Sequence, residues 1–147
     1  MNNIRDTLHN FWSGFYNRSE NLPEPLPLPA FQTGHVIFRD ENGKPAKTPL
    51  FPYITYDVEK PDTLDFNIIT ANIWDRNTSN PGFTGIVDDV LAQISEKISV
   101  CGALLDVGLD GKIWLLRSNP FITYLDDPTD NSIFRGIVRV IMRNYTI

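Results

Sequence analysis

The sequence predicts an α+β fold in which a mainly antiparallel sheet of about five to six strands packs against two helices. Two segments have apolar residues at helical spacing, near residues 3–16 and 84–99, and the segments around them are rich in β-branched and aromatic residues bounded by turns. In the first segment one helical face carries Ile4, Leu8, Phe11, Trp12 and Phe15, and Gly14 marks its end. In the second, Thr84 is a plausible N-cap with Asp88 and Asp89 in the early turns.

The expected strands follow from short runs of strand-forming residues between turn signals. We expect strands at residues 35–39, 49–58 and 65–75, with a turn at Asn42 and Gly43 after the first. After the second helix, residues 102–117 read as a hairpin around Asp110 and Gly111, and residues 120–125 read as a further strand. The last strand lies in the C-terminal stretch "SIFRGIVRVIMR".

That C-terminal stretch has an arginine at every fourth position, namely Arg135, Arg139 and Arg143. Its many isoleucines and valines, with Gly136 among them, favour a strand over a helix. Alternation then places Gly136 on an apolar face that belongs to the core, together with Phe134, Val138, Val140 and Met142. The opposite face mixes the three arginines with Ile133, Ile137 and Ile141.

A face that mixes isoleucine with arginine has three explanations. The aliphatic stems lie under the first helix, the arginines pair with local aspartates, or the face contacts another protein. If it is an interface, replacing Arg139 with glutamate weakens assembly and leaves the monomer folded.

The chain of 147 residues fits one domain, residues 1–147, with a proline-rich extended segment at residues 18–34 inside it. Prolines at every second position exclude a helix or a central strand there; they are Pro23, Pro25, Pro27 and Pro29. The segment is either a linker over the surface or an arm that reaches a neighbouring subunit.

Composition limits the classes of function. The net charge of −5 argues against a general binder of nucleic acid or anionic membranes. Cys101 is the single cysteine, which we expect to be buried between apolar neighbours, so no internal disulfide is expected. Neither a signal peptide nor a membrane span is visible, which predicts a cytosolic product without membrane contact.

Signals for catalysis are sparse, so we expect no enzyme activity and no cofactor. His9 and His35 have no cysteine or histidine at metal-ligand spacing, and no phosphate-binding or nucleophile motif is present. An acidic loop carries Asp126, Asp127 and Asp130. It is a solvated turn, a weak cation site without a calcium-loop pattern, or a contact for basic residues of a neighbour.

The order of motifs resembles the tail terminator, or tail completion, proteins of long-tailed phages that infect Gram-positive bacteria. The resemblance covers nearly the whole chain. It rests on "FWSGF" in the first helix, "FPYITYDV", the strand ending in "IWDR", the run "GKIWLLRSNPFITYLDD" and the basic C-terminal strand. These motifs are structural, so no catalytic residue is carried over.

The resemblance implies a virion protein that is assembled in the host cytoplasm and forms a six-membered ring on the last layer of the tail tube. The ring would stop tube growth and offer a surface for the head, with the tail tube protein and a head connector as partners. DNA would pass through it without specific binding. Such a ring needs a heterologous interface, for which the pattern offers Arg135, Arg139, Arg143, Asp126, Asp127, Asp130, Pro25 and Pro27. The alternatives are a head-closure protein of the same neck region, a small cellular binding module, or a small enzyme.

Overall fold

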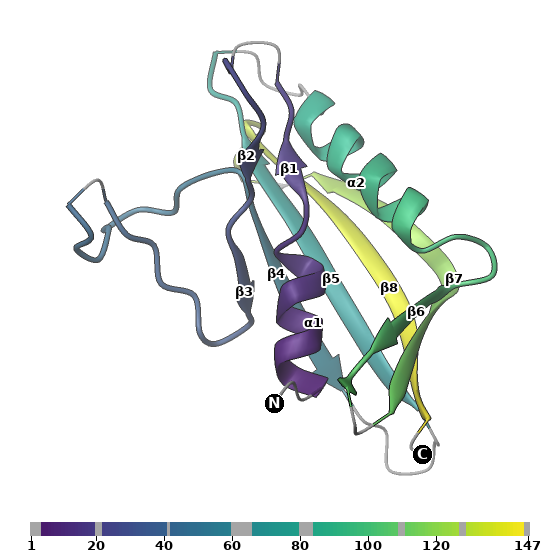
Figure 1. Cartoon of the computed structure of the whole chain (residues 1–147). Coiled ribbons are helices and arrows are strands. Elements are labelled where there is room, and N and C mark those ends of the chain that lie inside the picture. Colours follow the sequence, from purple (N-terminus) through teal and green to yellow (C-terminus); the bar gives the residue numbers. More distant parts are fainter. Residues whose placement is uncertain are drawn as a thin grey trace.

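The protein places two helices on one face of a curled six-stranded sheet (Figure 1). A computed structural model describes residues 4–19, 22–40, 42–59, 66–79, 84–108, 111–126 and 129–145. Within these residues the elements are α1 (Ile4–Trp12), β1 (Tyr16–Asn17), β2 (Leu26–Pro27), β3 (Ala30–Gln32), β4 (Tyr53–Glu59), β5 (Asn67–Arg76), α2 (Gly85–Lys97), β6 (Ala103–Asp106), β7 (Lys112–Asp126) and β8 (Ile133–Tyr145).

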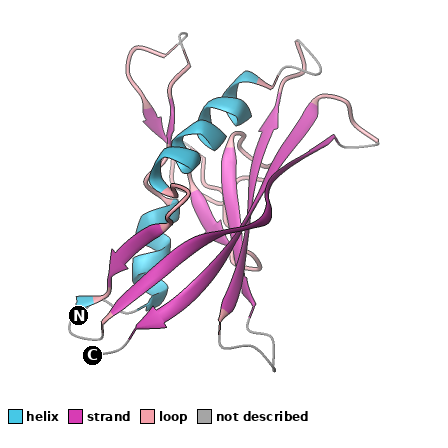
Figure 2. Cartoon of the chain, turned by 90° about the vertical axis from the view of Figure 1, so that its right-hand side faces the viewer, coloured by secondary structure: helices cyan, strands magenta, loops and turns pink. Residues whose placement is uncertain are grey.

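The order of strands in the main sheet is β3-β4-β5-β8-β7-β6, and β1 pairs with β2 in a separate small sheet. Every described pair is antiparallel except β3 with β4. The predicted α+β class, with a mainly antiparallel sheet and two helices, is therefore confirmed. The helices lie along one side of the sheet when the molecule is turned (Figure 2).

The C-terminal segment is a strand, as its alternation predicts, and it lies in the middle of the sheet between β5 and β7. Val138, Val140 and Met142 are buried on the side of the helices. Gly136 lies on the same side, against Val87 and Leu91 of α2. The predicted core face of this strand is confirmed.

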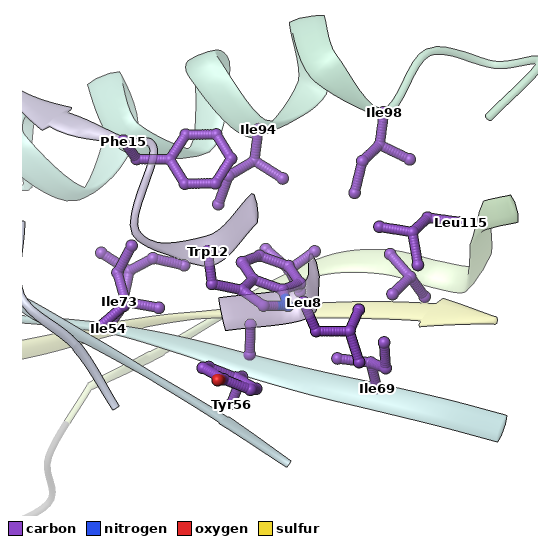
Figure 3. Packing of buried hydrophobic residues seen from close by; sticks show 14 of the residues in the cluster. Leu8, Trp12, Phe15, Ile54, Tyr56, Ile69, Ile73, Ile94, Ile98 and Leu115 are labelled. Atoms are coloured by element: carbon purple, nitrogen blue, oxygen red, sulfur yellow. The ribbon is translucent and has the colours of Figure 1, made fainter. Parts of the chain in front are cut away.

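The helix α1 forms where the sequence predicts it, because its apolar side chains at helical spacing meet the sheet. Leu8 and Trp12 are buried, and so is Phe15 just beyond the helix. The Trp12 ring stacks on Tyr56 of β4 with 6.3 Å between ring centres. Figure 3 shows Trp12 surrounded by side chains from the helices and the sheet.

The helix α2 also matches its prediction, and both of its ends are held by side chains. At the start, the Thr84 hydroxyl donates a hydrogen bond to the Asp88 carboxylate at 2.7 Å. It makes no capping bond to a backbone N–H. At the other end, Arg117 of β7 donates to the carbonyls of Ser95 and Ile98, which the helix itself leaves open.

The strand expected at residues 35–39 is wrong. This part of the chain forms only an isolated bridge between Arg39 and Pro45, around the expected turn at Gly43, whose φ is 77°. The position beside β4 is taken by β3, where Ala30 is buried. Among the residues that the structure describes, no strand pairs with residues 35–39.

The separate strand expected at residues 120–125 is also wrong, because β7 continues through it. The register of β7 against β8 shifts between Arg117 and Ile122. Residues 118–121 therefore lie opposite Arg139 as a bulge, and Pro120 is located inside it, where proline is tolerated in a sheet.

The proline-rich segment runs along the body of the protein. Pro27 lies opposite Tyr16 in the small β1–β2 sheet, and the Pro29 carbonyl accepts a hydrogen bond from Ile54 N–H of β4. Gln93 of α2 bonds the backbone N–H and carbonyl of Tyr16. The described part of the segment is thus tied to both α2 and the main sheet.

The expectation that Cys101 is buried is wrong. Cys101 is exposed in the turn between α2 and β6, where Ser99 and Gly102 form a bridge. Val100 beside it is 86% exposed. The apolar run around Cys101 contains a tight turn, since Gly102 has a φ of 89°, and the turn carries these residues away from the core.

Candidate interaction surface

The sheet side opposite α1 and α2, which we call the open face, gathers the three predicted arginines. Arg135, Arg139 and Arg143 alternate on it with isoleucines of β8. Ile137 is buried there although no described helix covers this side. The explanation that the arginine stems lie under the first helix is wrong, because α1 packs on the other face.

One end of the open face is a row of aromatic rings that ends on Arg135. The Arg135 guanidinium lies 4.8 Å from the centre of the Trp74 ring. Trp74 stacks on Tyr53 at 6.1 Å, and Tyr53 meets the Phe38 ring edge-on at 4.8 Å. Burial raises the pKa of Tyr53. The row places the Arg135 guanidinium over an aromatic ring, an arrangement that suits a protein contact.

The other end repeats this combination of arginine and aromatic rings. The Arg143 guanidinium lies 5.3 Å from the centre of the Phe66 ring. Trp114 of β7 is the direct partner of Arg143 in the register, and its ring lies 6.1 Å from that of Tyr145. Leu104 pairs with Trp114 from β6 and is exposed. Apolar and cationic groups therefore alternate along the whole face.

Arg139 lies between the two aromatic ends. Its partner across the sheet is Thr70 of β5, and Thr70 in turn lies opposite Asp57 of β4. In the part of the chain that the structure describes, none of Arg135, Arg139 and Arg143 forms an ion pair. Pairing with local aspartates therefore does not explain these arginines within those residues.

The predicted site aspartates and prolines do not all lie in one place. Asp130 makes an ion pair with Arg76 at 3.1 Å and also accepts hydrogen bonds from Ser132. Asp126 is the last residue of β7, and Asp127 lies outside the described residues. The predicted site prolines, Pro25 and Pro27, are exposed, and they lie at the separate β1–β2 sheet and not in the sheet that carries the arginines. The three arginines form one surface, and Asp130 adjoins its end through Arg76, which lies opposite Ile133.

The structure also reveals a feature that the sequence did not indicate, which we call the α1–β3 trough. Two adjoining open pockets of about 430 and 510 Å³ share Arg5, Gln32, His35 and Tyr56. His9 lines the first, and its Nδ1 lies 3.1 Å from the Tyr56 hydroxyl. Burial raises the pKa of Tyr56, while the charge of Arg5 opposes that shift.

The trough could not be found from sequence, because His9 of α1 and His35, which follows β3, come together only through the position of β3 next to α1. Asp6 and Asn10 also line the first pocket, and Ile4, Leu8, Val58 and Met142 make the second more apolar. The trough therefore has a more polar end and a more apolar end, and Arg5 and His35 line both.

Among the residues that the structure describes, no three histidine, cysteine, aspartate or glutamate side chains gather where they could hold a metal ion. No described helix is both long enough and apolar enough to cross a membrane. No protein-family model, curated protein or solved structure matches this chain.

Proposed function

We propose that this protein is a structural component of a phage tail, which forms a ring, hexameric in the related case, that ends tail-tube growth and offers a surface for the head. The open face is the observation that carries the proposal. It supports an assembly role because arginine and large aromatic residues are enriched where proteins bind one another. The resemblance of the motifs to tail terminators supports the same role.

The details of the open face favour a contact over a solvated surface. Arg135 and Arg143 lie on aromatic rings, which limits the side-chain entropy that binding removes. Isoleucines lie between the arginines, and Ile137 is already buried. A partner that covers this face buries apolar area and meets three cations, so we expect its contact surface to be acidic.

The test is the mass of the native protein over a range of concentrations, with negative-stain images of the same samples. Six-fold rings with an open centre are the expected result. Because a tail tube can template the ring, a monomeric sample is mixed next with purified tubes. Rings or caps at tube ends support the role, and a protein that stays monomeric and does not bind the tubes contradicts it.

The open face itself is tested by charge reversal. Arg139→Glu should leave thermal unfolding nearly unchanged and raise the protein concentration needed for half-assembly by about tenfold or more. Lys47→Glu is the matched control, since it makes the same charge change in the loop that projects from the sheet (Figure 1). Equal assembly of both variants would remove the open face from the proposal.

Two alternatives predict different outcomes. A head-closure protein of the same neck region would bind purified connectors and leave tube ends free. A small binding module would remain monomeric, and the α1–β3 trough is the feature that favours it. Binding to connectors, to tubes or to neither separates the three.

A further inference from the structure

The two edges of the main sheet are unlike, and one of them is long and unprotected. The edge strand β6 has four residues and pairs only with the first part of β7, from Lys112 to Leu115. From Leu116 to Asp126, no strand among the described residues lies on that side of β7. The bulge at residues 118–121 interrupts this edge, and from Phe121, the last residue of the bulge, β7 continues to Asp126 without a further shift in its register against β8.

Residues 121–126, "FITYLD", have the composition of a strand that pairs with another. The segment contains β-branched and aromatic residues, and two of them are exposed, Tyr124 at 52% and Leu125 at 44%. Natural sheets protect such edges with lysine, proline, bulges or a covering loop. Past Pro120 none of these is present in the segment, so it is suited to pairing with another strand.

The opposite edge is β3, which faces the α1–β3 trough. The Pro29 carbonyl and the Thr33 N–H both bond to β4. Because successive residues of a strand direct their backbone groups to opposite sides, those of Ala30 and Gln32 point away from β4. In the described residues only the Gln32 carbonyl has a partner on that side, the N–H of His35.

The lining of the trough also suits a strand from the free edge of β7. Ile4, Leu8, Val58 and Met142 line its apolar end, beside β3. The free edge of β7 is rich in apolar side chains up to Leu125. A segment of this kind can bury its apolar side chains in the trough while its backbone pairs with β3.

We propose that residues 121–126 of one copy pair with the β3 edge of the next copy, so that the sheet continues from subunit to subunit and apolar side chains of β7 meet the α1–β3 trough. This inference rests on the proposed ring, because joining two different edges is a heterologous contact that can close into one. If β7 instead paired with β7 of a second copy, the two-fold contact would stop at a dimer.

Cross-linking tests the pairing in the full chain. Cys101→Ser first removes the exposed native thiol, and Gln32→Cys and Tyr124→Cys are then introduced. Gln32 aligns with Tyr56 and Tyr124 aligns with Gly136, so both positions lie on the helix side of the sheet. A short bifunctional maleimide should give a ladder of covalent oligomers from the double variant. A mixture of the two single variants should give dimers only, and each alone should give none.

The outcomes separate this inference from the ring itself. Rings seen by negative stain that do not cross-link overturn the edge pairing and leave the ring standing. Dimers from the Tyr124→Cys variant alone show that β7 pairs with itself, which also overturns it. If neither rings nor cross-links form, with or without tail tubes, both proposals fail. Because Tyr124 interacts with Asp88, the unfolding temperature of each variant is compared with that of the Cys101→Ser parent.

Discussion

Asp75 is an acidic residue in an apolar place, on the side of β5 that packs against the helices. It is 3% exposed, and its Oδ2 has no hydrogen-bond partner among the described residues. Burial raises the pKa of Asp75, and a hydrogen bond from the backbone N–H of Arg76 opposes that shift. Ionised Asp75 therefore reduces the stability of the folded state near neutral pH.

We expect Asp75→Asn to stabilise the protein by roughly 1 kcal/mol at pH 7. Because the folded pKa lies above the ordinary value of 3.8, the folded state binds the proton more tightly than the unfolded chain does. The penalty is thus relieved as pH falls through the folded pKa, and the gain should disappear below about pH 4. Urea unfolding at both pH values measures this; a gain that is equal at both would contradict it. Asp57→Asn, which makes the same change of side chain on the open face, is the control for this measurement.

Neighbouring residues of β8 provide a test of which face is core. Val140 is fully buried on the helix side, while Ile141 is only half-buried on the open face. Val140→Asp should lose several kcal/mol and unfold the chain, because it buries an unpaired carboxylate. Ile141→Asp should stay folded. Circular dichroism shows which of the two variants is folded. A folded Val140→Asp variant and an unfolded Ile141→Asp variant would mean that the strand is shifted by one residue.

At the scale of residues, alternation in the sequence was enough to predict the side on which each β8 residue lies. It was not enough for Cys101, whose apolar neighbours indicated burial, because the turn at Gly102 depends on where α2 ends. It also gave no sign that His9 lies against Tyr56, 47 positions away in the sequence. Contacts of that kind depend on which strand lies next to the helix.

At the scale of elements, α2 packs closely on the central strand at Gly136. A Cβ at this position would lie 2.9 Å from Val87 Cγ1 and 3.0 Å from Leu91 Cδ1. Real side chains do not approach so closely, so the helix or the two side chains would have to move. Glycine here is explained by this close approach and not by any need for unusual backbone angles.

Gly136→Ala should therefore destabilise the protein by about 1–3 kcal/mol, although alanine is small and apolar. Leu91→Val shortens one of the two crowded side chains, so adding it to Gly136→Ala should restore part of the loss. Denaturant unfolding of both single variants and the double variant gives the coupling between them. Purely additive effects would show that the helix and strand do not meet at Gly136.

The helices and most strands of this fold could be predicted because each has a local periodic signal. The two errors, at residues 35–39 and at Pro120, arise from pairing. Residues 35–39 have strand-forming composition but no neighbour, since β3 occupies the edge of β4. Pro120 was read as the end of a strand, yet a bulge opposite Arg139 lets β7 pass through it. Neither a neighbour nor a bulge is visible in a local sequence pattern.

At the scale of the whole molecule, the loop between β3 and β4 extends away from the sheet (Figure 1). The described residues of this loop are 33–40 and 42–52. The Phe38 ring packs edge-on against the rings of Phe31 and Tyr53 on the open face. On either side of the loop, β3 and β4 are hydrogen-bonded to each other. The loop can therefore be cut without separating the strands that flank it.

Limited trypsin digestion should cut first after Lys47, which is exposed in this loop; Lys44 is followed by Pro45, and trypsin does not cleave that bond. The two fragments should remain together, because α1 and β3 of the first pack on the core of the second. A denaturing gel shows the cut, and native mass measurement shows whether the fragments stay associated. Fragments that separate would mean that α1 and β3 contribute little to the core.

The order of the strands is the part of the whole fold that the sequence leaves open. The α+β class and the mixed composition of the open face both follow from patterns within single segments. The α1–β3 trough requires that β3 lie at one edge of the sheet, and the free edge of β7 requires that β6 be short. Both features depend on contacts between distant segments, so the strongest site predictions concern Arg135, Arg139 and Arg143, which share one strand.

The exposed Cys101 has a practical consequence for any assembly that this chain forms. As the single cysteine of the chain, it gives every subunit one thiol for a fluorescent maleimide. The number of bleaching steps from one labelled particle then equals the number of copies in it. The cysteine that the sequence led us to expect in the core is therefore a labelling site with which the copies in an assembly can be counted.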